Sequence, residues 1–295
     1  MSRSLWHPRQ WPAWWALALL AVLAQLPRAV LAIMGALIGQ FLYFMHASRR
    51  RIVAVNLARC FPALSGPARR ALARAHFRAL GRGLFDAAFA WFAPPWRIRR
   101  AVRFVDRHCY DEALARGPVI LLVPHFVALE MGIVLAPERA MATIYKRGKS
   151  AVFNWAFVAR RGRFGGTAIE VGQGVKPAIR ALKRGEPLYY LPDQDLGEGR
   201  SVFAPFCGVA AATVPALAAL VRLTGASVVP LVVLQRGTGY EAVFMPPLRL
   251  ALDDAVATAT QMNAAIEAGI ALAPAQYFWV HKRFKTRPPG EPGFY

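Results

Sequence analysis

The sequence predicts an α/β fold: a mixed, largely parallel central sheet flanked by helices, preceded by an N-terminal hydrophobic segment that anchors the chain to a membrane. Three observations lead to this prediction. The segment "PVILLVP" (118–124) is short, continuously apolar and rich in β-branched residues, which is typical of a strand buried on both faces of a parallel sheet. Beyond it, strand patterns and helix patterns alternate along the chain. Before it, the first 50 residues are strongly apolar.

The composition fits one catalytic domain in contact with a membrane. Of the 295 residues, 56% are hydrophobic, and the mean hydropathy of +0.31 is high for a soluble enzyme. This length suits a single α/β domain with appended helices, and no stretch reads as an interdomain linker or an internal repeat. We therefore expect a membrane anchor over residues 1–50 and a catalytic domain over residues 51–295.

The charge balance points to partners that carry phosphate or carboxylate groups. The chain has 37 Lys and Arg against 16 Asp and Glu, for a net charge of +21, and such a field attracts nucleic acid, anionic lipid or an acidic carrier protein. No finger, zipper or RNA-binding signature accompanies the arginines, which argues against nucleic acid. The three cysteines, Cys60, Cys109 and Cys207, are widely spaced, so they indicate neither a disulfide framework nor a metal site and fit a reducing compartment.

Two apolar segments form the expected anchor. Residues 11–26 are almost wholly apolar and begin with a tryptophan cluster, and residues 29–48 contain no Asp, Glu, Lys or Arg. The second segment is long enough to span a bilayer, and the arginines at 49–51 would then mark the cytoplasmic side. Two short helices broken at residues 27–28 and lying in one leaflet fit equally well, because Gly, Gln or Pro interrupts each segment. The unpaired cysteines and the second apolar segment argue against a cleaved signal peptide.

A long helix is expected after the turn at residues 62–67. Apolar residues recur along it at intervals of three and four, namely Leu72, Phe77, Leu80, Leu84, Phe85 and Phe89. Arginines occupy its other face, where they would meet anionic headgroups or water; they are Arg69, Arg70, Arg74, Arg78 and Arg82.

The remaining elements alternate as an α/β fold requires. In chain order they are helix 176–184, strand 187–192, helix 214–224, strand 227–235, strand 240–247 and a final helix over about 253–272. Gly185 and Gly225 are expected to end the helices that precede them, and Thr213 to cap helix 214–224.

His125 and Glu130 are the first candidates for catalysis. His125 falls at the carboxyl end of strand 118–124, where open α/β sheets bind ligands, and Glu130 falls in the first turn of the element that follows. A carboxylate that holds an imidazole in one tautomer makes it a general base for a hydroxyl group. On residue pattern alone, a satisfied histidine and a glutamate favoured by a helix dipole explain the pair as well.

The spacing of these two residues resembles the H-x4-D/E motif of the lysophospholipid acyltransferase superfamily. Five further segments are similar, in order, to signatures of its lipid A branch, the late acyltransferases that add secondary acyl chains to the Kdo-bearing lipid A precursor. They are "NLARCFP" (56–62), "PDQDLG" (192–197), "SVFAPFCG" (201–208), "TGASVVP" (224–230) and "FWVHKRFKTRP" (278–288). The resemblance covers nearly the whole chain and includes the two-part apolar N-terminus.

This resemblance implies a reaction. The hydroxyl of a 3-hydroxyacyl chain on the lipid A precursor would lose its proton to His125, oriented by Glu130, and attack the thioester of an acyl carrier protein. General-base assistance of this kind contributes about a hundredfold to ten thousandfold. Neither an acyl-enzyme nor a metal or organic cofactor is required. The implied location is the bacterial inner membrane, with the catalytic domain on the cytoplasmic side and membrane lipids as neighbours.

Further positions are expected to bind substrate by the same resemblance. Arg161 or Arg163 would face substrate phosphate or the thioester, with Arg161 favoured. Tyr145 and Lys146 stand where relatives often have Tyr-Arg, and a lysine lacks the bidentate fork of arginine. Asp193 and Asp195 follow strand 187–192 and would bind sugar hydroxyls or order their loop. The basic terminal segment, including His281, Lys282 and Arg283, would meet a phosphorylated disaccharide or the acidic carrier.

Two other functions remain open at this point. The same chemistry could serve another lipid acceptor, such as a lysophospholipid, an aminolipid or a glycolipid. A non-catalytic membrane protein that grips acyl carrier or anionic lipid through its basic surface would also fit the charge, although intact His125 and Glu130 argue against it.

Overall fold

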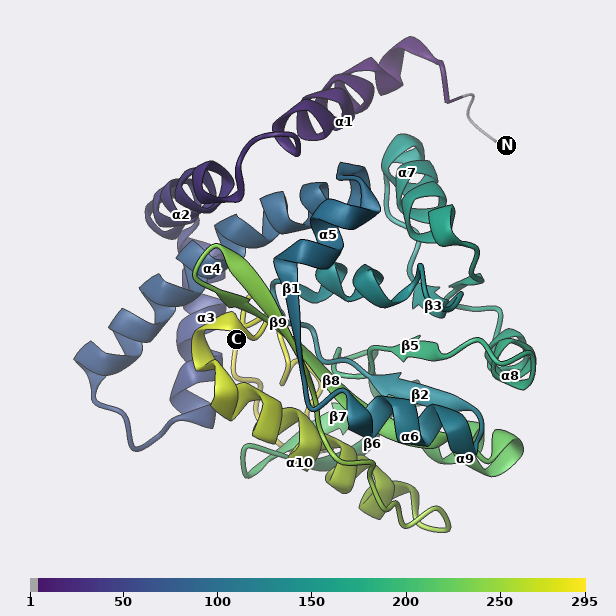
Figure 1. The fold of residues 1–295 in the computed structure, drawn as a ribbon. Coiled ribbons are helices and arrows are strands. Elements are labelled where there is room, and N and C mark those ends of the chain that lie inside the picture. Colours follow the sequence, from purple (N-terminus) through teal and green to yellow (C-terminus); the bar gives the residue numbers. More distant parts are fainter. Residues whose placement is uncertain (1–4) are drawn as a thin grey trace.

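In the computed structural model, which describes residues 5–295, a seven-stranded sheet forms the centre of the fold (Figure 1). Its strand order is β1-β9-β8-β2-β5-β3-β4. The strands are β1 (Val102–Val105), β2 (Val119–Leu122), β3 (Ala142–Tyr145), β4 (Ala168–Glu170), β5 (Leu188–Tyr190), β8 (Ser227–Arg236) and β9 (Gly239–Phe244). Every neighbouring pair is parallel except β8 and β9. The predicted mixed, largely parallel sheet is confirmed.

Helices cover both faces of this sheet. Residues of α8, α9 and α10 form the core on one face, and residues of α5 and α6 lie in the core on the other. The helices after residue 46 are α3 (Ala47–Cys60), α4 (Gly66–Phe92), α5 (Pro95–Ala101), α6 (His108–Arg116), α7 (Ala151–Arg161), α8 (Lys176–Lys183), α9 (Ala216–Thr224) and α10 (Ala255–Leu272). A two-stranded antiparallel hairpin, β6 (Val202–Phe206) and β7 (Val209–Thr213), lies outside the main sheet. The helices predicted over 176–184, 214–224 and about 253–272 are confirmed as α8, α9 and α10.

Strand β2 is buried on both faces, as its unbroken apolar run predicts. Ile120 and Leu122 point into one core with α8, α9 and α10, whereas Val119 and Leu121 point into a second core with α5 and α6. Alternation of side chains along a strand places successive residues on opposite faces. The two cores therefore fix β2 from both sides and hold the loop at its carboxyl end.

Helix α4 joins the two cores. Its Phe77 belongs to the first core, and Phe85 and Phe89 belong to the second. The residue before the helix, Ser65, is its N-cap: the Ser65 hydroxyl accepts a hydrogen bond from the backbone N–H of Ala68 at 3.3 Å. The long helix predicted after the turn at residues 62–67 is thus confirmed.

One predicted cap is wrong. The Thr213 hydroxyl donates to the backbone oxygen of Ala211 at 3.1 Å and accepts from Asn263 and Arg283, so it does not cap α9. The reason is that β7 extends to Thr213 and α9 begins only at Ala216, after Pro215. Gly225, at φ 66°, ends α9 as predicted.

The apolar N-terminus forms two helices, α1 (Trp11–Leu23) and α2 (Arg28–Met45), separated near Pro27. Within residues 5–295, α2 is the one helix long and apolar enough to cross a membrane, with 18 residues and a mean hydropathy of 1.6. By contrast, α1 has 13 residues, fewer than a span needs. Both helices lie along one side of the molecule (Figure 1).

Helix α2 packs closely along α4 rather than standing apart from the catalytic domain. A Cβ added to Gly81 of α4 would lie 2.1 Å from the backbone oxygen of Gly35 and 2.5 Å from the backbone nitrogen of Gly39. A Cβ at these distances would clash, so the two helix backbones can approach each other this closely only because glycines stand at these positions. The expected division into an anchor over residues 1–50 and a catalytic domain over residues 51–295 remains a prediction. In the fold the two parts are packed together, because α2 lies against α4.

Candidate active site

The candidate site lies at the carboxyl edge of the parallel strands. His125 follows β2, Asp193 follows β5 and Tyr145 ends β3, and these strands are parallel neighbours in the order β2-β5-β3. Carboxyl ends of parallel strands meet at one edge of a sheet, which is where open α/β folds bind ligands. Residues 68 positions apart in the sequence are thereby brought into contact.

Asp193 forms two hydrogen bonds with His125. The backbone N–H of His125 donates to Asp193 Oδ2 at 2.8 Å, and the imidazole Nδ1 lies 2.5 Å from Asp193 Oδ1. Because an ionised carboxylate only accepts hydrogen bonds, Nδ1 must carry the proton. Within residues 5–295 no group is hydrogen bonded to Nε2, and the side chain is 20% exposed. The free nitrogen can therefore accept a proton from a substrate.

Asp193 is ionised despite its burial. The carboxylate is 1% exposed, and burial by itself raises its pKa, but the positive charge that His125 carries when protonated and the hydrogen bonds from the His125 ring and backbone hold the pKa at about 2. A permanent negative charge beneath the ring favours the Nδ1–H tautomer and stabilises the imidazolium formed when Nε2 takes a proton.

The backbone around His125 is fixed by the C-terminal segment. Phe278 donates its backbone N–H to the His125 oxygen at 2.8 Å, and Val127 donates to the Gln276 oxygen at 2.9 Å. Between them, Phe126 and Tyr277 form an antiparallel bridge. The "FWVHKRFKTRP" segment therefore supports the histidine loop, a contact between distant parts of the chain that the sequence pattern did not indicate.

The expected pairing of Glu130 with His125 is wrong. Glu130 lies in a short 3-10 helix (Leu129–Leu135), where its carboxylate accepts from Trp91 Nε1 at 3.0 Å and forms an ion pair with Arg161. The physical reason is that the 3-10 turn directs the Glu130 side chain toward α4 and α7. The imidazole Nδ1 of His125 is hydrogen bonded to Asp193 instead. Glu130 still lies near His125, whose positive charge when protonated is among the causes that lower the pKa of Glu130.

The pKa of Glu130 reflects a buried ion pair. Burial raises the pKa, but the charge and hydrogen bonds of Arg161, with the hydrogen bond from Trp91, outweigh that effect and lower it. Glu130 and Arg161 are only 16% and 12% exposed. A buried pair of this kind has fixed geometry, because breaking it would leave an uncompensated charge.

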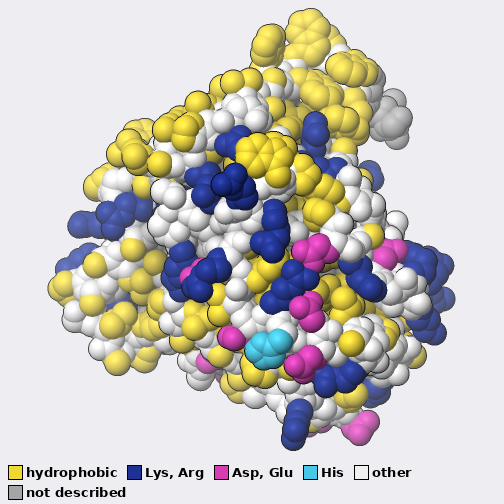
Figure 2. Space-filling model, in the orientation of Figure 1, with side chains coloured by type: hydrophobic (Ala, Val, Ile, Leu, Met, Phe, Trp, Pro, Cys, Tyr) yellow, Lys and Arg dark blue, Asp and Glu magenta, His cyan; other side chains and the backbone are white. Residues whose placement is uncertain are grey.

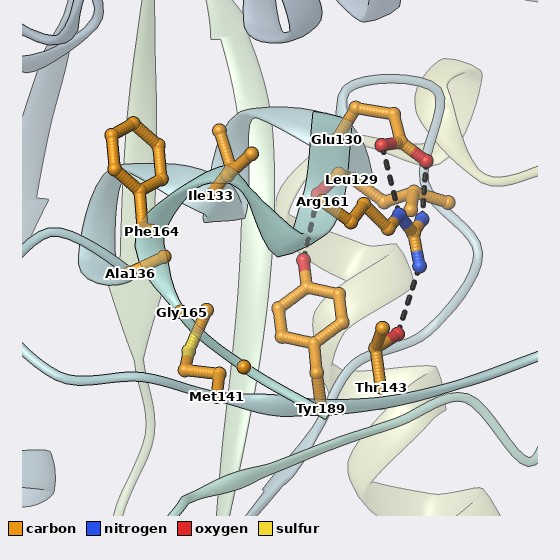
Figure 3. Close-up of a pocket in the computed structure, with 11 residues that line it drawn as sticks. Leu129, Glu130, Ile133, Ala136, Met141, Thr143, Arg161, Phe164, Gly165 and Tyr189 are labelled. Carbon is orange, nitrogen blue, oxygen red and sulfur yellow. Dashed lines mark hydrogen bonds and ion pairs between the residues drawn. The ribbon is translucent and has the colours of Figure 1, made fainter. Parts of the chain in front are cut away.

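Arg161 connects the ion pair to the sheet. Its Nη1 donates to the Thr143 hydroxyl at 2.8 Å, and its guanidinium lies 4.1 Å from the centre of the Phe157 ring. Figure 3 shows Arg161 between Glu130 and Thr143, at one end of a pocket lined mainly by apolar residues. On the floor of this pocket the Tyr189 hydroxyl donates to the Leu129 oxygen at 2.7 Å. The pair thus lies where little water reaches it.

Arg163, the second arginine considered, has a structural position. It donates to the backbone oxygens of Ala90, Trp91 and Ala93 at 2.9 to 3.2 Å, and these atoms belong to the carboxyl end of α4 and the residue after it. A cation at this end of a helix satisfies free carbonyls and complements the helix dipole. The structure therefore favours Arg161 over Arg163 for a role at the site.

Tyr145 and Lys146 lie at the carboxyl end of β3, on the same edge as His125. Tyr145 is half-buried and its ring lies 5.4 Å from that of Phe157, whereas Lys146 is exposed. Substrate binding by these two residues remains a prediction.

Asp195 orders its loop, which is one of the two roles expected for it. Its carboxylate accepts from the backbone N–H and the hydroxyl of Thr286, at 2.7 and 2.8 Å, and from the backbone N–H of Gly197 at 3.0 Å. Its own backbone N–H donates to His281 Nε2 at 3.0 Å. Both carboxylates are thus buried and hydrogen bonded within the fold, and the binding of sugar hydroxyls by Asp193 or Asp195 remains a prediction.

The terminal basic segment is only partly a charged surface. Arg283 is 1% exposed and donates to the Ala212 oxygen and the Thr213 hydroxyl at 2.7 and 2.9 Å, so its expected contact with substrate phosphate is wrong. Burial lowers the pKa of His281 to about 4, which leaves this residue neutral near pH 7. Lys282 is exposed, and its binding role remains a prediction.

Two residues of the site, Trp91 and Thr143, were missed by the sequence reasoning; they hold the Glu130–Arg161 pair. Asn56, the first residue of the "NLARCFP" segment, donates to the backbone oxygens of Trp279 and His281 at 2.7 and 2.8 Å. The one available signal was the tryptophan, since a buried indole N–H usually has a partner.

Comparison with known proteins identifies the family of the chain. The family model described as bacterial lipid A biosynthesis acyltransferase matches residues 1–286. The chain belongs to this family. The chain is 35% identical to the lipid A biosynthesis lauroyltransferase of Escherichia coli K12 over 300 residues, which cover all of this chain and 98% of that protein. It is also 35% identical to the lipid A biosynthesis palmitoleoyltransferase of the same organism, in a match that covers 100% of this chain and 97% of that protein. Its identity to the lipid A biosynthesis myristoyltransferase of that organism is 32%, over 98% of this chain and 92% of that protein.

Membership of the lipid A biosynthesis acyltransferase family confirms the resemblance seen in the sequence and makes the chain an acyltransferase. The family match includes α1 and α2 together with the site, so the apolar helices are part of the lipid A biosynthesis acyltransferase pattern.

Proposed function

We propose that this acyltransferase moves a fatty acyl chain from the thioester of an acyl carrier protein to the hydroxyl of a 3-hydroxyacyl chain on a Kdo-bearing lipid A precursor. The observation that carries this proposal is the His125–Asp193 pair, in which Nδ1 is bound and Nε2 is free, in a chain of the lipid A family. The names of the relatives, which cite lauroyl, palmitoleoyl and myristoyl transfer in lipid A biosynthesis, support an acyl donor of this class.

The proposed reaction is a direct transfer. His125 Nε2 removes the proton from the acceptor hydroxyl, and the oxygen attacks the thioester carbonyl to form a tetrahedral oxyanion. Collapse of this intermediate breaks the carbon–sulfur bond, and the departing thiolate takes the proton from Nε2, which leaves an ester and a free thiol. Among residues 5–295 no serine or cysteine side chain is hydrogen bonded to His125, in keeping with a mechanism that has no acyl-enzyme.

Glu130 acts in this scheme as a positioning residue for Arg161. Three of the five guanidinium hydrogens of Arg161 are used by Glu130 and Thr143, so two remain for an oxyanion or a substrate phosphate. A guanidinium fixed in advance stabilises developing charge without having to reorganise during the reaction.

The enzyme would work at the bacterial inner membrane from the cytoplasmic side. Apolar side chains of α1 and α2 face outward and form a ridge along one side of the molecule (Figure 2). Its large exposed members are Trp11, Trp15, Leu19, Val22, Val30, Ile33, Leu37, Ile38, Phe41, Phe44 and Met45. A ridge of this size on a soluble protein would be unusual, and lipid is the medium that suits it.

The contact between α2 and α4 favours helices that lie in one leaflet over a membrane span. A Cβ at Gly39 would lie 2.8 Å from the Arg78 Cα, so α2 cannot enter the hydrocarbon without taking α4 with it. Along α4, Arg74 and Arg78 are exposed, and arginines at the bilayer centre are costly. The helices would therefore rest at the interface with the apolar ridge buried.

Mass spectrometry of lipid A tests the proposed function. The host is a Gram-negative strain that lacks its own late acyltransferases and produces the wild type, His125→Ala or the matched control His108→Ala, whose imidazole is exposed on α6. We expect the mass of one acyl chain to be gained with the wild type and the control but not with His125→Ala. Unchanged lipid A, with the added acyl group found on phospholipid or aminolipid, would contradict the proposed acceptor.

A further inference from the structure

A basic cleft lies beside β1, the outer strand on the side of the sheet away from β4, and its lining shares no residue with the site described above. It has a volume of about 670 Å³ and is formed by α5, the first residues of β1 and β9, the end of β8 and the start of α2. Five arginines line it against a single carboxylate, Glu241; they are Arg28, Arg99, Arg100, Arg103 and Arg236. This balance leaves the cleft strongly positive.

Only part of this positive charge is compensated within the fold. Arg103 and Arg236 both form ion pairs with Glu241. Within residues 5–295 no carboxylate pairs with Arg99 or Arg100, and both side chains are exposed. At least two guanidinium groups are therefore available to a ligand that carries negative charge, and guanidinium binds phosphate oxygens in a bidentate manner.

A glycine leaves room for Arg28 at the base of the cleft. A Cβ at Gly239 would lie 3.4 Å from Arg28 Nη1 and 3.1 Å from the Ala101 oxygen, the atom to which Arg28 donates at 3.3 Å. A Cβ there would be tight against the Ala101 oxygen and in contact with the guanidinium, so glycine leaves room for Arg28. The hydrogen bond to the Ala101 oxygen holds Arg28 at the base of the cleft.

The cleft borders the apolar surface. Trp96 is 61% exposed on α5, and Arg99 and Arg100 follow it at intervals of three and four residues, on the same side of the helix. Arg28 is the first residue of α2, whose outer face is apolar. Figure 2 shows basic side chains over α5 and the start of β1 directly beside the apolar ridge. A tryptophan next to arginines is typical of the headgroup level of a membrane.

We propose that this cleft binds the phosphate headgroup of an anionic phospholipid in the membrane on which α1 and α2 rest. The charge complements a phosphodiester, and the apolar ridge beside the cleft gives the acyl chains of the same lipid a place in the bilayer. A folded acidic protein would match the charge but would have to approach from the side that the membrane occupies.

The position of the cleft gives this binding a consequence for the enzyme. Arg236 ends β8, which is parallel to β2 and next to it, so the cleft and His125 lie at the same edge of the sheet. A lipid held in the cleft keeps that edge against the membrane surface. The inference concerns lipid binding and stands whether or not the proposed acceptor is correct.

Binding of fluorescent phosphatidylglycerol to the full-length protein in a neutral detergent tests the proposal, with fluorescent phosphatidylcholine as the comparison lipid. The variant is Arg99→Glu/Arg100→Glu. The matched control, Arg116→Glu/Arg180→Glu, makes the same charge change at exposed positions on α6 and α8, which lie away from α1 and α2 (Figure 1). We expect the wild type to bind phosphatidylglycerol at least tenfold tighter than phosphatidylcholine, the variant to lose this preference, and the control to change less than twofold.

Four results would overturn the proposal. Retained preference in the variant would show that the cleft is not the site, and an equal loss in the control would show general attraction by net charge. Displacement of the lipid by inorganic phosphate at the same concentration would assign the cleft to free phosphate. Loss of binding to acyl carrier protein in the variant, with lipid binding unchanged, would assign it to a protein partner. Arg99→Gln/Arg100→Gln, which removes charge without reversing it, provides the same readout if the first variant folds poorly.

Discussion

Asp193 contacts His125 at both its backbone N–H and its imidazole Nδ1, at 2.8 and 2.5 Å. One carboxylate thus sets the position of the loop and the tautomer of the ring. In this arrangement an aspartate holds a histidine base in one tautomer. The two residues follow the ends of neighbouring parallel strands, β2 and β5.

The first prediction concerns this carboxylate. In Asp193→Asn the amide can present an N–H to Nδ1, which favours the tautomer with its proton on Nε2 and removes the base. We expect kcat to fall about a hundredfold to ten thousandfold, with little change in KM for the acceptor, in assays of acyl transfer. Asp111→Asn, at an exposed position on α6, serves as the control. A kcat within threefold of the wild type would show that Asp193 does not hold the base.

The second prediction separates Glu130 from His125. If Glu130 acts through Arg161, Glu130→Gln loses the ion pair that fixes the guanidinium and Arg161→Lys loses the guanidinium itself. Each variant should lower kcat about a hundredfold. The double variant should be no slower than the worse single variant, because residues that act as one unit give non-additive effects. Multiplied losses in the double variant would indicate independent roles.

The third prediction concerns the junction between α2 and α4. Gly81→Ala places a Cβ 2.1 Å from the Gly35 oxygen, so the helices must separate. Overpacking of this kind costs about 1 to 3 kcal/mol. We expect a lower free energy of unfolding in detergent, by thermal or denaturant titration. Gly293→Ala, where an added Cβ meets nothing within 4 Å, is the control. Equal stability of the two variants would contradict the close packing.

The fourth prediction concerns pH. His76 is fully buried, and burial lowers its pKa to about 4 from an ordinary value of 6.5. Its Nδ1 donates to the Ala275 oxygen at 3.0 Å, while Nε2 has no partner among the described residues. A second proton on the ring would therefore be buried without an acceptor.

Because the folded pKa of His76 lies below the unfolded one, its contribution to stability is fully present above pH 6.5 and is lost as the pH falls toward 4. The loss amounts to about 3 kcal/mol. His76→Gln keeps a donor for Ala275 but does not titrate. We expect the difference in unfolding free energy between pH 7 and pH 4 to be smaller in this variant, and an identical pH dependence would show that His76 titrates normally when folded.

Much of the fold could be predicted because its signals are local. The unbroken apolar run of β2 predicted burial on both faces, and Gly225 predicted the end of α9, since a left-handed residue there strongly favours glycine. Strands β3 and β4 have four and three residues, too few for a periodic pattern, and their pairing depends on tertiary contacts. They were found only in the structure.

For the candidate site, too, only the local features could be predicted from the sequence. His125 could be placed at the carboxyl end of a strand from the sequence. Its partner could not, because a spacing of five residues made Glu130 the apparent neighbour, whereas strand order brings Asp193, 68 residues away, into contact. Arg283 was mistaken for a surface charge since nothing in a basic segment shows which guanidinium is enclosed by the hairpin and α10.

The most direct test of the account is acyl transfer by the purified protein, with acyl carrier thioester as donor and Kdo-bearing lipid A precursor as acceptor, followed by mass spectrometry of the product. We expect the wild type to add one acyl chain and His125→Ala to do so at least about a hundredfold more slowly, as loss of a general base requires. A rate in His125→Ala within tenfold of the wild type would contradict the assignment of His125 as the base.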